Sequence, residues 1–218
     1  MKLQNQILHI GKFLFQYRGQ IPILLILIAA PVIYKTSYYA KIPIETQSIV
    51  KCIAILIAFC GLIIRFITVA TTPTGTSGKN RKRQVADQLN TTGIYSIVRN
   101  PLYLANYLIW LGVSIFTFNL YFLIFMSLFF WLFYKRIMFA EECFLESKFG
   151  EKYLLWSKNV NSFFPTKLNF IKSNIYFSFK SILRREYSSV LSIVLVYPFA
   201  LIKSKDEMPN IYALGEWH

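Results

Sequence analysis

The sequence predicts an all-α fold, a polytopic transmembrane helical bundle with four to five membrane segments. Three observations lead to this class. Hydrophobic residues make up 55% of the 218 residues and charged residues only 16%, and the mean hydropathy is +0.44. A water-soluble protein of this size needs more charge to cover its surface, so much of this surface is expected to face lipid. The apolar residues also gather in runs near the ~20 residues that carry a helix across a bilayer.

The first two runs belong to the N-terminal part of the chain. Residues 21–34 form a short run with a proline near each end, which marks a helix start and a kink or stop. Residues 49–70 are long enough to cross, although Arg65 lies inside this run. Its side chain is expected either to extend to the near interface or to point into a polar site.

Two further crossings are predicted from one long apolar stretch, residues 102–140. Polar Asn119 lies near its middle and is the expected tip of a helical hairpin. A fifth run, residues 190–202, is shorter and is broken by Pro198. It is expected either to cross the bilayer or to dip into one leaflet.

Basic residues exceed acidic ones by 24 to 10, which gives a net charge of +14. With so many apolar runs, this excess indicates attraction to an anionic membrane surface, and no nucleic-acid partner is expected. The basic residues lie in the N-terminal segment, in residues 71–101 and after the fourth run, whereas the turn at Asn119 is uncharged. The positive-inside rule therefore predicts a multi-pass protein with a cytoplasmic N-terminus, in the inner (cell) membrane if the source is bacterial.

Three regions follow from this pattern. Residues 1–87 are expected to form an N-terminal anchor with two transmembrane helices and a basic loop. The basic cluster Lys79–Arg83 in that loop is expected either to bind lipid phosphates as an anchor or to guide a substrate. Residues 88–165 are expected to form a core around the hairpin, and 166–218 a basic, aromatic tail lying on the membrane surface. The three cysteines have no CxxC or Cys/His spacing, so neither a disulfide framework nor a metal site is expected.

The segment before the third run carries groups suited to an anion. Gly93 permits a tight turn, and Pro101 fits the first turn of a helix. Arg99 and Asn100 are therefore expected at a helix N-terminus beside the membrane interface, where free backbone N–H groups favour an anion. Arg99 adds a planar, always-charged fork that suits a carboxylate or a phosphate.

Two adjacent carboxylates, Glu141 and Glu142, follow the fourth run. By the predicted topology they lie on the same side of the membrane as Arg99. Such carboxylates can hold an ammonium group or lie near a sulfonium. They can also simply pair with Arg99 or with Arg136, and both readings stay open at this point.

The residues on either side of the predicted hairpin occur in a characteristic order. They are Gly93, Tyr95, Val98-Arg99-Asn100-Pro101, Tyr103, Glu141-Glu142, Leu145, Phe149-Gly150, Tyr153 and Phe164-Pro165. In this order and spacing they resemble the isoprenylcysteine carboxyl methyltransferase and phospholipid methyltransferase superfamily. The resemblance covers residues 88–165, about a third of the chain.

This resemblance implies a small helical membrane enzyme that is an S-adenosylmethionine-dependent methyltransferase. It implies a cofactor pocket that faces the cytoplasm and a lipid or lipidated acceptor that enters from the bilayer. On the matching positions, the expected catalytic residues are Arg99 and Glu142. The residues expected to bind the cofactor are Asn100, Tyr103, Glu141 and Tyr95, of which Tyr95 could stack on adenine or shelter the cation.

One position departs from the family pattern, which often has histidine where this chain has Asn100. Asparagine cannot take up a proton near neutral pH, and the only histidines are His9 and His218, outside the motif. An acceptor that is already nucleophilic, a carboxylate or phosphate oxygen, is therefore slightly favoured over an amine. An amine would need one of the two carboxylates, a tyrosine or water to receive its proton.

Two other classes of function remain as alternatives. The C-terminal part of sterol reductases looks similar, so a nicotinamide-dependent membrane reductase is one of them, although such proteins are generally much longer. The other is a non-catalytic membrane scaffold. A binding measurement separates the three functions. A methyltransferase binds a methyl donor, a reductase binds a nicotinamide cofactor, and a scaffold binds neither.

Overall fold

The computed structural model describes residues 3–21, 24–25, 27–28, 31–32, 42–73, 84–167 and 169–186. The helices in this part are α1 (Leu3–Tyr17), α3 (Ile44–Ala70), the short 3₁₀ helix η2 (Ile94–Ser96), α4 (Pro101–Phe116), α5 (Leu120–Phe149), α6 (Glu151–Asn159) and α7 (Phe179–Arg185). The described residues contain no named strand, only the isolated bridges Gly93–Ile171 and Val98–Asn161. The predicted all-α class is confirmed.

Two helices, α3 and α5, are long and apolar enough to cross a membrane, and α4 is apolar but shorter. They contain the predicted runs 49–70 and 102–140. The run 21–34 is described only at scattered positions. The run 190–202 and the basic cluster Lys79–Arg83 lie outside the described residues.

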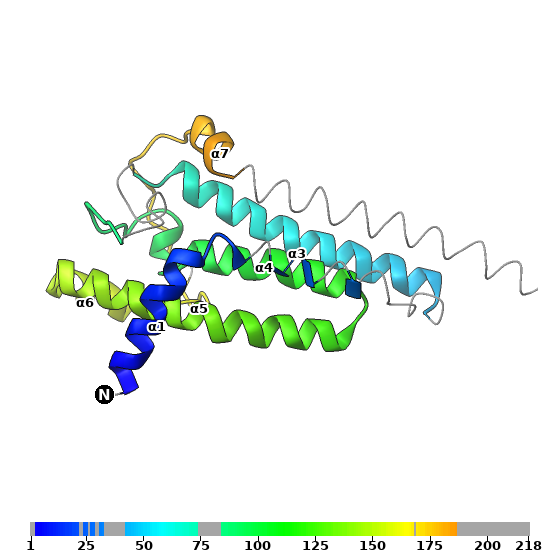
Figure 1. Cartoon of the computed structure of the whole chain (residues 1–218). Coiled ribbons are helices and arrows are strands. Elements are labelled where there is room, and N and C mark those ends of the chain that lie inside the picture. Colours follow the sequence, from blue (N-terminus) through cyan, green and yellow to red (C-terminus); the bar gives the residue numbers. More distant parts are fainter. Residues whose placement is uncertain are drawn as a thin grey trace, which may run out of the picture.

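Helices α3 and α4 pack closely because small residues line their contact. A methyl group added at Gly112 of α4 would collide with the carbonyl oxygen of Ala54, and one added at Gly61 of α3 would lie 2.8 Å from that of Ala105. Ala54 and Ala105 are themselves fully buried. Small residues of this kind let membrane helices approach until their backbones touch. Figure 1 shows α3, α4 and α5 running side by side.

Helices α4 and α5 form the predicted hairpin. Helix α4 ends at Phe116, Phe118 adopts a positive φ of 53° in the turn, and the side chain of Asn119 accepts a hydrogen bond from the backbone N–H of Phe122. The predicted hairpin tip at Asn119 is confirmed. At about 1.5 Å per residue, the 30 residues of α5 outreach the 16 of α4 by about 20 Å. The C-terminal turns of α5 therefore extend past the start of α4.

Helix α1 crosses α5 near this extension (Figure 1). Gly11 makes the crossing close, since a methyl group there would collide with the carbonyl oxygen of Arg136 and lie 2.9 Å from the Cβ of Ala140. The crossing brings the residues that follow α1 to the turns of α5 that carry the two adjacent glutamates.

The loop before α4 is held from two sides by later parts of the chain. The N–H groups of Arg99 and Asn100 donate to the carbonyls of Asn161 and Ser162, at 2.8 and 3.1 Å. The N–H of Gly93 donates to the carbonyl of Ile171 at 2.7 Å. This loop, the end of α5 and the segments after α6 therefore meet at one end of the bundle.

Candidate active site

The carboxylate of Glu142 is the centre of a hydrogen-bond network. One of its oxygens, Oε1, accepts from Asn100 Nδ2 at 2.8 Å and from the Ser162 hydroxyl at 2.6 Å. The other, Oε2, accepts from Arg99 Nη2 at 2.8 Å, and Arg99 Nε lies 3.4 Å from Oε1. Donors from two separate segments, residues 99–100 and Ser162, therefore converge on one carboxylate, which holds it in a fixed orientation.

Arg99 ties this network to the chain that follows α6. Its Nη1 donates to the carbonyl oxygens of Ser157 and Val160, at 2.7 and 3.2 Å. The other edge of the guanidinium faces Glu142. Because its donors are used on both edges, Arg99 fixes the position of Glu142 and of residues 157–160 relative to α4.

The local sequence explains why Arg99 and Asn100 lie here. Gly93 adopts a φ of +63°, a conformation that favours glycine, and η2 follows it directly. Asn100 is the N-cap of α4 and Pro101 its first residue, as the sequence predicted. The side chain of Asn100 does not cap the helix. It instead donates to Glu142 and to both the carbonyl and the hydroxyl of Ser162.

Glu141 takes part in a second cluster. Successive residues of an α-helix point about 100° apart, so Glu141 and Glu142 face different partners. Glu141 accepts a hydrogen bond from the Tyr103 hydroxyl and forms an ion pair with Arg18, at 3.5 Å. The Arg18 guanidinium in turn lies over the ring of Phe15, 3.7 Å from its centroid. The crossing of α1 over α5 thus supplies the charge that neutralises Glu141.

Two tyrosines outside α3, α4 and α5 border these clusters. Burial raises the pKa of the Tyr153 phenol, and the nearby Glu142 raises it further. Burial likewise raises the pKa of Tyr95, with a smaller contribution from Glu141. Both phenols therefore stay neutral at physiological pH. Tyr153 donates a hydrogen bond to Glu142, whereas the Tyr95 oxygen accepts from Thr72 and Asn90.

A pocket with a cavity volume of about 210 Å³ opens beside Tyr95. It is lined by the end of α3, the segment before η2 and part of the tail, namely Thr71, Pro73, Gln88, Leu89, Asn90, Thr91, Thr92, Tyr95, Asn174 and Ile175. These lining residues carry amides, hydroxyls and one aromatic ring and no charged side chain. Neutral donors and acceptors of this kind match the hydrogen-bonding edges of a base and a ribose. The lining of this pocket is therefore chemically compatible with a nucleoside.

The structure brings five of the six predicted site residues into two adjoining clusters. Arg99, Asn100 and Glu142 share the first, Tyr103 and Glu141 share the second, and Tyr95 lines the pocket. The roles predicted for them stay predictions.

Three contributors were not singled out by the sequence: Arg18, Tyr153 and Ser162. Tyr153 lies within the motif, and Ser162 lies just before the Phe164–Pro165 pair that ends it. The motif could therefore have pointed to both residues. Arg18 carried none beyond its positive charge, because only the crossing of α1 over α5 places it at Glu141.

Comparison with protein families finds one match. Residues 49–152 match the phospholipid methyltransferase family. This range includes most of α3 and all of α4 and α5, and therefore Arg99, Asn100 and both glutamates, but not Arg18 or Ser162. The family recognised from the motif residues is confirmed. Comparison with curated proteins and with solved structures gives no match.

Proposed function

Because residues 49–152 carry the sequence pattern of the phospholipid methyltransferases, we propose that this protein is an integral membrane methyltransferase that uses S-adenosylmethionine. Its acceptor is the polar head of a lipid or of a lipidated molecule. One observation carries the proposal. Two motif elements that lie more than 40 residues apart in the sequence, Arg99–Asn100 before α4 and Glu142 near the end of α5, meet in a single hydrogen-bond network.

S-adenosylmethionine would supply a methyl group on a sulfonium, and its transfer to an acceptor oxygen leaves a neutral thioether. The protein then has mainly to align the reactants and to exclude water. Glu141 and Glu142, whose charges are matched by Arg18 and Arg99, would offer carboxylate oxygens to the amino group of the cofactor. Arg99 acts as a positioning residue, since it holds Glu142 in place. The pocket beside Tyr95 holds the nucleoside through neutral hydrogen bonds.

An anionic oxygen, from a carboxylate or a phosphate, is the acceptor that the site supports best. Such an oxygen releases no proton when it is methylated, whereas an amine must pass one to a base. Both carboxylates already accept hydrogen bonds from neighbouring donors, and Asn100 stands where the family often has a histidine. The described side chains of the two clusters include no histidine that could take up such a proton.

The site faces the cytoplasm in this proposal, and the protein is a multi-pass protein of the cell membrane. Support comes from the distribution of basic residues, most of which lie at the end of the bundle that carries the site, whereas the turn at Asn119 carries none. The lipid acceptor would then approach along the bilayer, between the helices and the headgroup layer.

Binding of S-adenosylmethionine to the purified, detergent-solubilised protein tests the proposal. We expect saturable binding by wild type, and binding at least tenfold weaker for Glu142→Gln and for Arg99→Ala, because each change leaves a charged partner unpaired. The matched control is Glu146→Gln, since Glu146 lies about one turn further along α5 and is exposed. It should bind like wild type.

Each other outcome points to a different function. A folded wild type that binds a nicotinamide cofactor and no methyl donor would be a reductase, and one that binds neither would be a scaffold. Thermal unfolding of every variant in the same detergent shows whether a variant that fails to bind is still folded. Where binding is found, transfer of a labelled methyl group into extracted lipids, with base lability of the product, distinguishes an ester from a methylated amine.

A further inference from the structure

The chain after α6 returns to the end of α3 and is fixed there. The N–H of Ile171 donates to the Ser96 hydroxyl at 2.9 Å, and the N–H of Ser178 donates to the carbonyl of Ala70 at 3.2 Å. Helix α7 then packs on α3 with Ile182 buried. Figure 1 shows α7 beside the C-terminal turns of α3. This segment therefore lies where a membrane-crossing helix leaves the bilayer.

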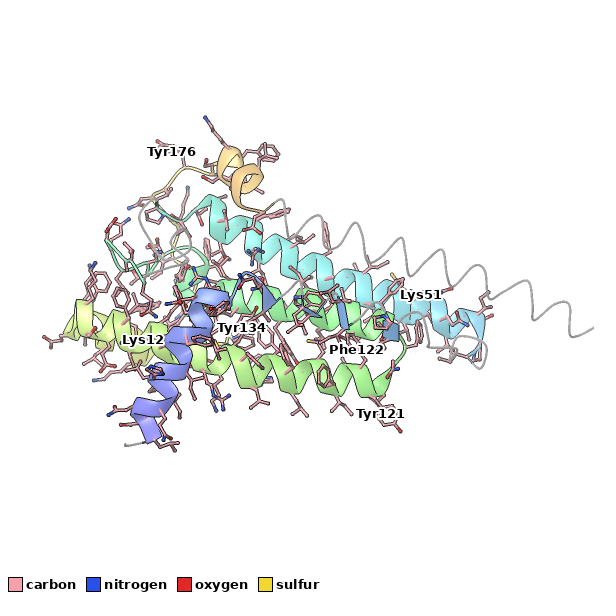
Figure 2. The ribbon with its side chains drawn as sticks, viewed as in Figure 1. Lys12, Lys51, Tyr121, Phe122, Tyr134 and Tyr176 are labelled. Carbon is pink, nitrogen blue, oxygen red and sulfur yellow. The ribbon has the colours of Figure 1, made fainter. Side chains whose placement is uncertain are left out.

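The outward side of this segment is strongly apolar. Tyr176 is 94% exposed and Phe177, Phe179 and Leu183 are each about 60% exposed. Figure 2 shows Tyr176 pointing away from the helices. We call these four residues, together with exposed Phe170, the tail patch. Aromatic side chains grouped on a surface in this way are typical of the headgroup region of a membrane, where a ring can lie in lipid and its polar edge in water.

The charge of the surrounding sequence has one sign. Residues 152–185 contain no Asp or Glu, and their seven basic residues are Lys152, Lys158, Lys167, Lys172, Lys180, Arg184 and Arg185. Lys172 and Lys180 lie between residues of the tail patch in the sequence and are exposed. A basic residue close to a membrane is attracted to anionic lipid, with an effect of about a factor of five in the binding constant for each residue.

We propose that the tail patch docks into the headgroup layer of an anionic bilayer, with Lys172 and Lys180 on lipid phosphates or carboxylates. Aromatic rings, exposed lysines and the adjacent end of α3 all point to this one partner. The same segment contributes Asn174 and Ile175 to the pocket beside Tyr95. Docking therefore places the pocket mouth at the level of the lipid headgroups. The proposal does not depend on methyl transfer, because docking needs neither cofactor nor acceptor.

The test uses the full-length protein in lipid nanodiscs. In a variant with Cys52, Cys60 and Cys143 replaced by alanine, Tyr176→Cys is labelled with an environment-sensitive fluorophore, and quenching by lipids with brominated acyl chains is measured. Nanodiscs contain either phosphatidylcholine alone or a mixture with phosphatidylserine. The control label is placed at Glu151→Cys, which is exposed at the start of α6, away from the tail patch.

We expect the label at 176 to be quenched in the anionic nanodiscs, more strongly than in the neutral ones and more strongly than the label at 151. Lys172→Gln with Lys180→Gln should lower the ratio of docked to undocked segments about 25-fold. Raising the salt to about 1 M should act in the same direction, because it screens exposed charges. A label at 176 that remains in water, or quenching that is equal in both lipids and insensitive to salt, overturns the proposal.

Discussion

Glu186 pairs with Arg65, although 121 residues separate them in the sequence. The Nε of Arg65 donates to the Glu186 carboxylate, which is 2% exposed, and Nη1 donates to the side-chain oxygen of Asn106. An arginine inside an apolar run could extend to the interface or point into a polar site. Here it binds an acid that arrives from beyond α7 and an amide from the neighbouring helix α4.

This pairing predicts that removing one partner destabilises the fold. Glu186→Gln leaves the charge of Arg65 unmatched, and we expect the free energy of unfolding in detergent to fall by about 3 kcal/mol. Replacing both residues, Arg65→Leu with Glu186→Leu, should recover most of this loss, since no buried charge then remains. Chemical unfolding of the three proteins measures the effect.

The control for this pair is Glu151→Gln, because Glu151 is exposed and should change stability by less than about 0.5 kcal/mol. If Glu186→Gln were as stable as that control, the pair would be a weak contact and α7 would be held by its apolar side alone.

Close packing between α3 and α4 leads to a second prediction. Gly112→Ala places a methyl group against the backbone of Ala54, which cannot move as a flexible side chain does. We expect a loss of about 2 kcal/mol or more in unfolding free energy. Cys60→Ala, on the exposed face of α3, is a matched change in size and should be neutral. Equal stability of the two variants would mean that the helices can separate slightly at no cost.

The sequence predicted the hairpin and its tip at Asn119 because both depend on local rules, an apolar length and a polar turn residue. It also predicted that Arg99 and Asn100 lie at the start of a helix, since Gly93 and Pro101 encode that geometry locally.

Contacts between distant segments could not be predicted in this way. The approach of Arg18 to Glu141 depends on how α1 crosses α5, and no local pattern encodes a crossing angle. The same holds for Arg65, which was expected either to extend to the interface or to point into a polar site, because no local pattern encodes its pairing with Glu186. Ser162 lies within the stretch that the resemblance covers, but its hydrogen bond to Glu142 could not be predicted, because only the pairing of residues 161–162 with 99–100 brings it there.

Ser162 provides a third prediction, which concerns the network as a unit. Ser162→Ala removes one of the donors to the Glu142 carboxylate, and we expect binding of S-adenosylmethionine to weaken about tenfold, with little change in stability. In combination with Glu142→Gln the losses should not add, because both changes weaken the same hydrogen-bond network. Ser147→Ala, on the exposed side of α5, serves as the control. Additive losses would show that Ser162 acts apart from Glu142.

The proposed topology leads to the last prediction. Tyr121 lies at the hairpin tip and is 77% exposed, whereas Glu151 lies at the other end of α5. In a variant lacking the native cysteines, a membrane-impermeant thiol reagent added to intact cells should label Tyr121→Cys, and should label Glu151→Cys only after permeabilisation. The reason is that basic residues cluster at the end of the bundle that holds Glu151 and the site, and such ends are retained in the cytoplasm. Labelling in the opposite order would place Arg99 and Glu142 on the outer side, where no cytoplasmic pool of S-adenosylmethionine could reach them.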